Sequence, residues 1–241
     1  MRKNHIMLAL VIAIQLGILS VGCNNTAPVK PAPVESVIIQ KTASTCLDNA
    51  CSIGDTLVFG TWDNKPIQWR IIDKDIYNHR YMLLAMDVLG KRPYHTTYSS
   101  VTWEDSTIRS WLNGYNPYNN SAGVDYRSDN FISRAFTSKE RSQIPKVKVV
   151  NDNNTQYGSV GGRDTEDYVF LLSINEVNAL LPLQYNMCSK INCELCWWLR
   201  SPGYNASAAA YVLPRGTIEP NGNEVNKDLL GGVRPALWLN Y

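Results

Sequence analysis

The hydrophobic pattern divides the chain into an apolar leader, a polar connecting stretch and a long region with the alternation of a folded domain. Residues 6–21 are almost entirely apolar. Residues 24–36 are polar, rich in proline and without periodicity, so they cannot bury a core and predict an extended tether. From residue 52 onwards, short apolar and polar runs alternate to the end of the chain, which indicates a globular domain.

Several of these short runs have the composition of β-strands. Residues 56–62 and 67–73 are rich in β-branched and aromatic side chains and flank a turn-forming cluster, which predicts a β-hairpin. The run 81–86 is apolar throughout and predicts a buried strand. We expect further strands at 147–150, 168–172 and 208–213, with residues 217–219 pairing back, a turn at 220–223 and a last strand at 231–240.

Helices are predicted where capping residues precede helix-spaced apolar positions. Asp105 and Ser106 can cap a helix over 107–113 that stops at Gly114. Ser173 and Glu176 form a capping box for a helix over about 174–181. Shorter helical pieces are expected at 131–135 and from 137, and residues 151–167 form a long polar loop of the kind that is often functional.

Two stretches near the end of the chain combine tryptophan, arginine and proline: Cys196–Gly203 and Gly232–Leu239. The large apolar side chains predict two core strands that lie close together and close a sheet. Arg200 and Arg234 are flanked by these side chains, so we expect them to clamp backbone carbonyls or a carboxylate.

The N-terminus has the features of an export signal. Arg2 and Lys3 precede an apolar run that is short for a membrane span of about 20 residues, which predicts a signal peptide over 1–22. Its end, Leu19-Ser20-Val21-Gly22-Cys23, resembles the lipobox of bacterial lipoproteins, with Ser20 where the usual pattern has Leu; ordinary signal cleavage is the alternative. We therefore expect a lipidated Cys23, a tether over 23–44 and a domain over 45–241, exported and anchored to the membrane at the bacterial cell surface.

Charge argues against nucleic acid as a partner. The chain has 23 basic and 21 acidic residues, and removing Arg2 and Lys3 with the leader leaves 21 of each. A near-neutral chain has no basic field for a phosphate backbone. Nothing in the sequence calls for a cofactor.

The cysteines suggest disulfides. If Cys23 is lipidated, five remain: Cys46, Cys51, Cys188, Cys193 and Cys196. In an exported protein we expect Cys46 to pair with Cys51, and Cys188 with Cys193 or Cys196, although pairing between the two clusters is also open. A zinc site at Cys193-x-x-Cys196 would lack its second half, so we predict no metal there.

Several motifs resemble an uncharacterised family of bacterial domains, known only as a domain of unknown function and frequent in secreted and lipid-anchored proteins. The resemblance runs from about Ser52 to Tyr241 through the motifs Ile67-x-Trp69-Arg70, 101–113, 158–164, Val169–Ser173, Trp197–Gly203 and Gly232–Trp238. The ending is also distantly similar to the C-type-lectin-like fold of formylglycine-generating enzymes. This second resemblance implies an α+β domain of C-type-lectin-like type, with antiparallel strands and a few short helices.

We favour a non-enzymatic binding module for a glycan or a protein. Its face would be made by loops 201–208, 214–224 and 226–231, with Tyr204, Asn205, Tyr211, Asn221 and Asn223 as ligand-binding candidates, because amide and aromatic groups suit sugar hydroxyls and ring faces. The triplet Glu219-Pro220-Asn221 has the form by which some C-type lectins hold calcium, but a chance turn explains it better. The alternatives are an enzyme that uses the same groove and a structural envelope protein.

Overall fold

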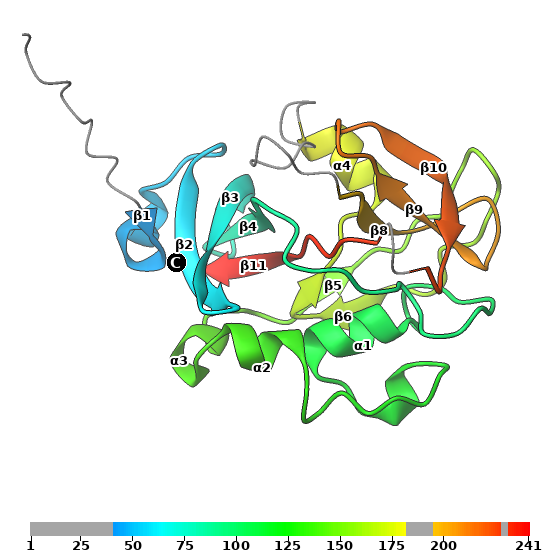
Figure 1. Ribbon diagram of the computed structural model, residues 1–241. Coiled ribbons are helices and arrows are strands. Elements are labelled where there is room, and N and C mark those ends of the chain that lie inside the picture. The colour runs from blue at the N-terminus through cyan, green and yellow to red at the C-terminus, as the bar shows by residue number, and fades with distance from the viewer. Residues whose placement is uncertain (1–40, 182–194, 228–230) are drawn as a thin grey trace, which may run out of the picture. The chain divides into compact units, whose positions relative to one another are not determined.

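The computed structural model describes residues 41–181, 195–227 and 231–241, all within a compact unit that spans Ile39–Tyr241 (Figure 1). The predicted signal peptide, Cys23 and most of the tether lie outside the described residues. Within the described part, no helix is long and apolar enough to cross a bilayer. The fold is a mixture of α and β structure with mostly antiparallel strands and a few short helices.

The largest element is a six-stranded sheet in the order β1-β2-β3-β4-β11-β7. Only β1 and β2 run parallel; the other neighbours are antiparallel. Its strands are β1 (Lys41–Thr42), β2 (Thr56–Trp62), β3 (Lys65–Asp75), β4 (Arg80–Ala85), β7 (Val169–Phe170) and β11 (Ala236–Asn240).

The predicted hairpin is confirmed as β2 and β3. Asp63 and Asn64 join the two strands, and both adopt positive φ, at 48° and 59°. A two-residue hairpin turn with this backbone matches the twist of the flanking strands, and Asp and Asn tolerate it better than most residues. The side chains of Trp69 and Ile71 are completely buried, as are most of those of the predicted core strand β4.

A second sheet has three antiparallel strands in the order β10-β9-β8: β8 (Trp197–Pro202), β9 (Ala208–Val212) and β10 (Ile218–Glu224). The turn predicted at 220–223 is wrong, because these residues continue β10 through a bulge between Glu219 and Asn223. Gly222 makes the bulge possible: its φ is +73°, and a Cβ there would lie 2.4 Å from the Ala209 carbonyl oxygen of β9. A two-stranded sheet, β5 (Val147–Val149) with β6 (Thr165–Asp167), completes the β structure.

The two tryptophan-rich segments touch, as predicted, but they do not share one sheet. Cys196 O accepts from Gly232 N at 2.9 Å, and Trp198 N donates to Gly232 O at 3.0 Å. Beyond this contact, β8 joins the three-stranded sheet and β11 joins the six-stranded sheet. The predicted strand over 231–240 is therefore shorter, and residues 231–235 connect the two sheets.

The helices are short and capped as the sequence predicts. They are α1 (Thr107–Asn113), α2 (Phe131–Ala135), α3 (Ser138–Arg141) and α4 (Ile174–Leu180), with 3-10 turns η1 (Ala43–Asn49) and η2 (Pro117–Asn119). Ser106 caps α1 through its side chain, and Ser173 with Glu176 forms the expected capping box of α4. In Figure 1, α1, α2 and α3 follow one another along the lower side of the view.

Buried polar side chains of the sequence motifs fasten the loops and helices to the sheets. The Asp167 side chain is completely buried and accepts from Arg109 Nε at 2.7 Å and Trp103 Nε1 at 2.9 Å. Asn113, at the end of α1, donates its Nδ2 to Val169 O at 2.8 Å and accepts from Val169 N at 3.0 Å. One carboxylate and one amide thus satisfy the backbone and ring groups that short elements leave unpaired.

Arg200 and Arg234 are clamps, as predicted. Arg200 donates to Leu171 O at 2.8 Å and Val150 O at 2.8 Å, and its guanidinium forms a bidentate ion pair with Glu176. Arg234 Nε donates to Ala85 O at 2.8 Å, and burial lowers the Arg234 pKa to about 10. Each guanidinium therefore ties together segments that are distant in the sequence.

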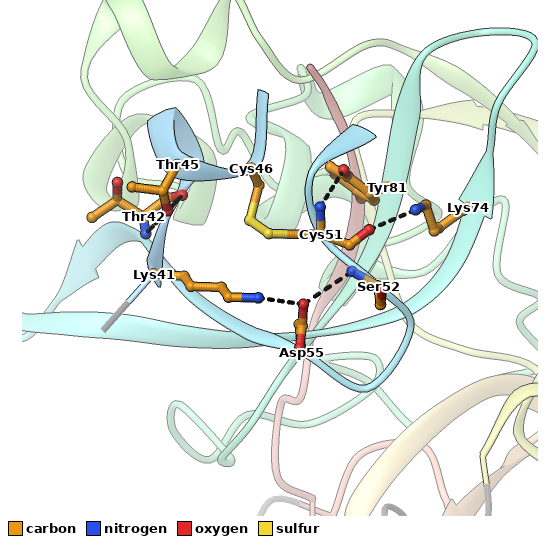
Figure 2. The surroundings of a disulfide bond; sticks show 9 residues. All are labelled: Lys41, Thr42, Thr45, Cys46, Cys51, Ser52, Asp55, Lys74 and Tyr81. Carbon is orange, nitrogen blue, oxygen red and sulfur yellow. Dashed lines mark hydrogen bonds and ion pairs between the residues drawn. A yellow bond between two sulfur atoms is a disulfide. The ribbon is translucent and has the colours of Figure 1, made fainter. Parts of the chain in front are cut away.

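The disulfide between Cys46 and Cys51 is confirmed, and both cysteines are buried (Figure 2). Around it, Cys51 N donates to the Tyr81 hydroxyl at 3.1 Å and Lys74 Nζ donates to Cys51 O, so the disulfide segment is fastened to β3 and β4. Cys196 is buried with a free thiol, which rules out its pairing with Cys188 and agrees with the alternative in which Cys188 pairs with Cys193. Cys188 and Cys193 lie outside the described residues.

Candidate functional site

A hollow of about 280 Å³ lies where the loop after β5, the start of α4 and the second sheet meet. We call it the amide hollow, because asparagine and glutamine dominate its wall. Its lining residues are Asp152, Asn153, Asn154, Thr155, Gln156, Ile174, Asn175, Asn178, Ser201, Ile218 and Pro220.

The amide hollow is not the largest hollow in the described residues. One of about 490 Å³ lies between the β2–β3 hairpin and residues 87–89, and Trp62 and Ile67 form part of its wall. Its polar groups come mostly from one hairpin turn. The amide hollow instead gathers polar groups from a loop, a helix and a strand, which is the convergence expected of a specific site.

Asn154 holds the loop of the amide hollow in place. Its side chain is only 3% exposed, and its Nδ2 donates to Pro220 O at 2.7 Å and Pro202 O at 2.9 Å. Its Oδ1 accepts from Gln156 N at 3.2 Å, which turns the chain toward the hollow. One amide therefore fixes the loop to both β8 and β10 and leaves its neighbours to face a ligand.

The glycine motif 158–164, in the second half of the loop, packs against the lining residues of the hollow. At Gly161 a Cβ would lie 2.3 Å from the Asp152 carbonyl oxygen. Only glycine therefore allows the two halves of the loop to approach this closely. Gly161 N also donates to Asn153 Oδ1 at 3.0 Å. Asp164 Oδ1 accepts from Asn151 N at 3.1 Å at the start of the same loop. The motif 158–164 thus shapes the wall of the hollow.

The helical side of the amide hollow is also fixed by hydrogen bonds. Ile174 N, in the first turn of α4, donates to Ser201 Oγ at 2.9 Å. Asn175 Nδ2 donates to Asp152 Oδ2 at 2.8 Å across the hollow. Both contacts are made within the protein itself and hold these groups in place, and such preorganisation reduces the entropy lost on binding.

Two of the ligand-binding candidates proposed from the sequence lie beside the amide hollow. Tyr204 is 50% exposed, and its backbone N–H donates to Asn221 O at 2.7 Å. Asn221 is exposed and follows Pro220, which lines the hollow. An aromatic face and an amide therefore extend the polar surface of the hollow.

The other three candidates have local or core contacts. Asn205 Oδ1 accepts from Ser207 N at 2.8 Å, and Asn223 Oδ1 accepts from Glu224 N at 2.9 Å. Tyr211 is half-buried against the Trp198 ring at 6.2 Å, and this burial raises its pKa. Of the three loops named for the binding face, 201–208 and 214–224 are described throughout, whereas residues 228–230 of the third lie outside the described residues.

The sequence analysis missed the central lining residues Asp152, Gln156, Asn175 and Asn178. The sequence signal was the high density of asparagine in the loop that begins at residue 151. The sequence does not show that this loop lies against α4. Asn175 and Asn178 lie on α4, where helical spacing gives no sign of a nearby loop. Only the tertiary contact between Asn175 and Asp152 places them at one site.

His95 is the one histidine buried in the described residues, and its contacts fit a structural role. Its Nδ1 accepts from Thr107 N at 3.2 Å, so the ring proton must lie on Nε2, which faces Ser121 Oγ at 3.3 Å. A nitrogen that carries a proton cannot deprotonate Ser121, and burial lowers the His95 pKa. His95 therefore supports the start of α1 and does not activate a nucleophile in this arrangement.

In the part of the chain that the structure describes, no group of three or more His, Cys, Asp and Glu side chains lies close enough together to hold a metal ion. In the Glu219-Pro220-Asn221 triplet, Glu219 pairs with Tyr211 just before the bulge of β10, and Pro220 and Asn221 lie within the bulge.

Comparison with known proteins identifies the family but no studied relative. No curated protein and no solved structure matches the chain. Residues 78–241, more than half of the chain, match the family described as Domain of unknown function (DUF6273). The match includes α1, the second sheet and the lining residues of the amide hollow, whereas β1, β2 and β3 precede it. The chain therefore belongs to this family of domains of unknown function.

Proposed function

We propose that the protein is an exported, non-enzymatic binding module that holds a glycan in the amide hollow. The observation that carries the proposal is the convergence of amide, hydroxyl and carboxylate groups from three elements around one preorganised hollow. Side-chain amides can donate to and accept from the same sugar, so they suit a ligand that presents many hydroxyl groups.

The size and the apolar part of the hollow agree with a sugar. Small-molecule sites begin at about 300 Å³, and the amide hollow, at about 280 Å³, is close to this lower end, which suits a small ligand segment. Ile174, Ile218 and Pro220 supply apolar contacts for the C–H face of a ring. Tyr204 is half exposed and bonded through its backbone to Asn221, next to the lining residue Pro220, so we propose its ring as a stacking surface for a sugar that extends beyond the hollow.

We also propose that Cys23 is lipidated and that the Pro-rich tether connects the domain to a bacterial membrane. The support is the apolar leader, the Gly22-Cys23 junction and the composition of residues 24–36. In Figure 1, β1, where the described chain begins, and β10 lie at opposite ends of the domain. A ligand at the hollow would thus bind far from the point where the tether joins the domain.

For the fold, we propose a C-type-lectin-like arrangement. The support is the order of its C-terminal parts: a tryptophan-rich strand β8, an alanine- and tyrosine-bearing strand β9, and a Gly-x-Arg segment that returns beside β8. A crystal structure that superimposes on a C-type lectin over both sheets would support this arrangement, and a different strand order would refute it.

A glycan array tests the proposed function. The domain from residue 39 is applied with calcium and with a chelator, beside the variants Asn178→Ala in the hollow and Asn119→Ala in η2 as a control. We expect binding in both conditions, reduced at least fivefold by Asn178→Ala alone, as the loss of one or two hydrogen bonds predicts. Binding that requires calcium and is lost in Asn221→Ala would move the site to the Glu219-Pro220-Asn221 triplet. No binding to any sugar would refute the proposal and favour a protein ligand.

A further inference from the structure

We infer that the amide hollow selects saccharides that carry a protonated amine, with the Asp152 carboxylate as the partner of the ammonium group. The inference rests on the proposed function and names its ligand class. It follows from the charge of the hollow and from the hydrogen bonds that its own groups already make.

Among the described residues that line the amide hollow, Asp152 alone carries a charge. Arg200 is next to Ser201 in the chain, and its guanidinium is paired with both oxygens of Glu176. That ion pair is neutral as a unit, so it does not offset the charge of Asp152. The hollow therefore presents a net negative potential to a ligand.

Existing hydrogen bonds also leave the hollow rich in acceptors. Asp152 Oδ2 accepts from Asn175 Nδ2 at 2.8 Å, and because a carboxylate only accepts, the Asn175 amide orientation is determined. Among the described residues, no donor occupies Asp152 Oδ1 or Asn175 Oδ1, so both can accept from a ligand N–H. Gln156 Nε2 donates to the Tyr157 hydroxyl at 3.4 Å, which leaves Gln156 Oε1 as a third acceptor.

Two backbone donors in the first turn of α4 that could attract an anion are already occupied. Ile174 N donates to Ser201 Oγ at 2.9 Å, and Glu176 N donates to Ser173 Oγ at 3.1 Å. The first turn of α4 therefore offers these two N–H groups to its own protein and not to a carboxylate or phosphate on a ligand. A donor-rich cation fits the wall better than an acidic sugar.

The expected preference follows from the exposure of Asp152, which is only partly buried. A well-formed hydrogen bond to a charged group contributes more to binding than an exposed ion pair does. Between these two cases, we expect an amino sugar to bind roughly five- to tenfold more tightly than its N-acetylated counterpart.

Calorimetry with the full chain in detergent tests this inference. The probes are tetramers of glucosamine, of N-acetylglucosamine and of glucose, at a pH where the free amine is protonated. The variants are Asp152→Asn, which removes the charge but keeps the shape, and Asp63→Asn, a matched charge change in the exposed β2–β3 turn. We expect the preference for glucosamine to disappear in Asp152→Asn and to persist in Asp63→Asn.

The outcomes separate the inference from the proposed function. Equal affinity for the three tetramers, or a preference that survives Asp152→Asn, overturns the inference and leaves glycan binding intact. No binding of any tetramer overturns both. A peptide with a free N-terminal amine is the last probe: if it binds with dependence on Asp152 while glucosamine does not, the amine site is real but its saccharide source is wrong.

Discussion

Replacing Asp167 by Asn should severely destabilise the domain. The Asp167 side chain is completely buried and accepts from Arg109 Nε, Trp103 Nε1 and, at 2.7 Å, Thr165 Oγ1. Asn would keep the shape but place an N–H₂ group among donors, and it would leave the Arg109 guanidinium without its counter-ion. Both effects act at the junction of α1, β6 and the loop that begins with Trp103.

The magnitude follows from burial. The side chain of Arg109 is 9% exposed and that of Asp167 0%, so solvent cannot compensate for the lost pair. Removing one partner of a buried ion pair costs about 3–5 kcal/mol. Domains of this size have a free energy of unfolding of about 5–15 kcal/mol, so the variant should be close to the limit of folding.

Urea unfolding followed by tryptophan fluorescence measures the change in the free energy of unfolding. The matched control is Asp129→Asn, because the Asp129–Arg134 pair is exposed, at 3.3 Å with side chains 67% and 51% accessible. We expect a change of about 0–1 kcal/mol there. If Asp167→Asn shifts the free energy of unfolding by no more than this control does, the buried polar residues of the motifs do not stabilise the fold as proposed.

Three further predictions concern acid, packing and the disulfide. Since burial lowers the pKa of His95 below about 6.5, the unfolded chain binds this proton first. Stability should therefore fall as the pH drops from about 6.5, and His95→Asn, which cannot titrate, should flatten that part of the urea-midpoint profile; unchanged profiles would contradict this. Gly161→Ala should lower the free energy of unfolding by about 1–3 kcal/mol and weaken sugar binding, whereas Gly90→Ala, in open space, should change neither. Replacing Cys46 and Cys51 by Ser should lower the free energy of unfolding by roughly 2 kcal/mol, as the entropy of a short loop predicts. The melting temperature should fall, and a reducing agent should no longer change it.

The local elements could be predicted from the sequence because their signals are local. Ser106 caps α1, the Ser173–Glu176 capping box starts α4, and Asp63 and Asn64 make the hairpin turn. Each of these residues acts on a backbone group within a few positions, so spacing alone identifies it. The roles of Arg200 and Arg234 as clamps followed from their apolar neighbours.

The errors arose where distant segments decide the structure. Pro220-Asn221-Gly222 has the composition of a turn, but pairing with β9 extends it into a bulged strand. Both tryptophan-rich segments lack a regular alternation of apolar and polar residues, so their pattern could not assign β8 and β11 to different sheets. The amide hollow combines a loop, a helix and two strands, and no local pattern reports such a convergence.

The most direct test of the account is an NMR titration of the ¹⁵N-labelled domain with a glucosamine tetramer. We predict that the side-chain amide signals of Gln156, Asn175 and Asn178 shift together, because these residues line the amide hollow. The indole signal of Trp62 should remain unchanged, since Trp62 lines the larger hollow beside the β2–β3 hairpin. A shift of the Trp62 indole without any change in the three amides would place the ligand elsewhere and contradict the account.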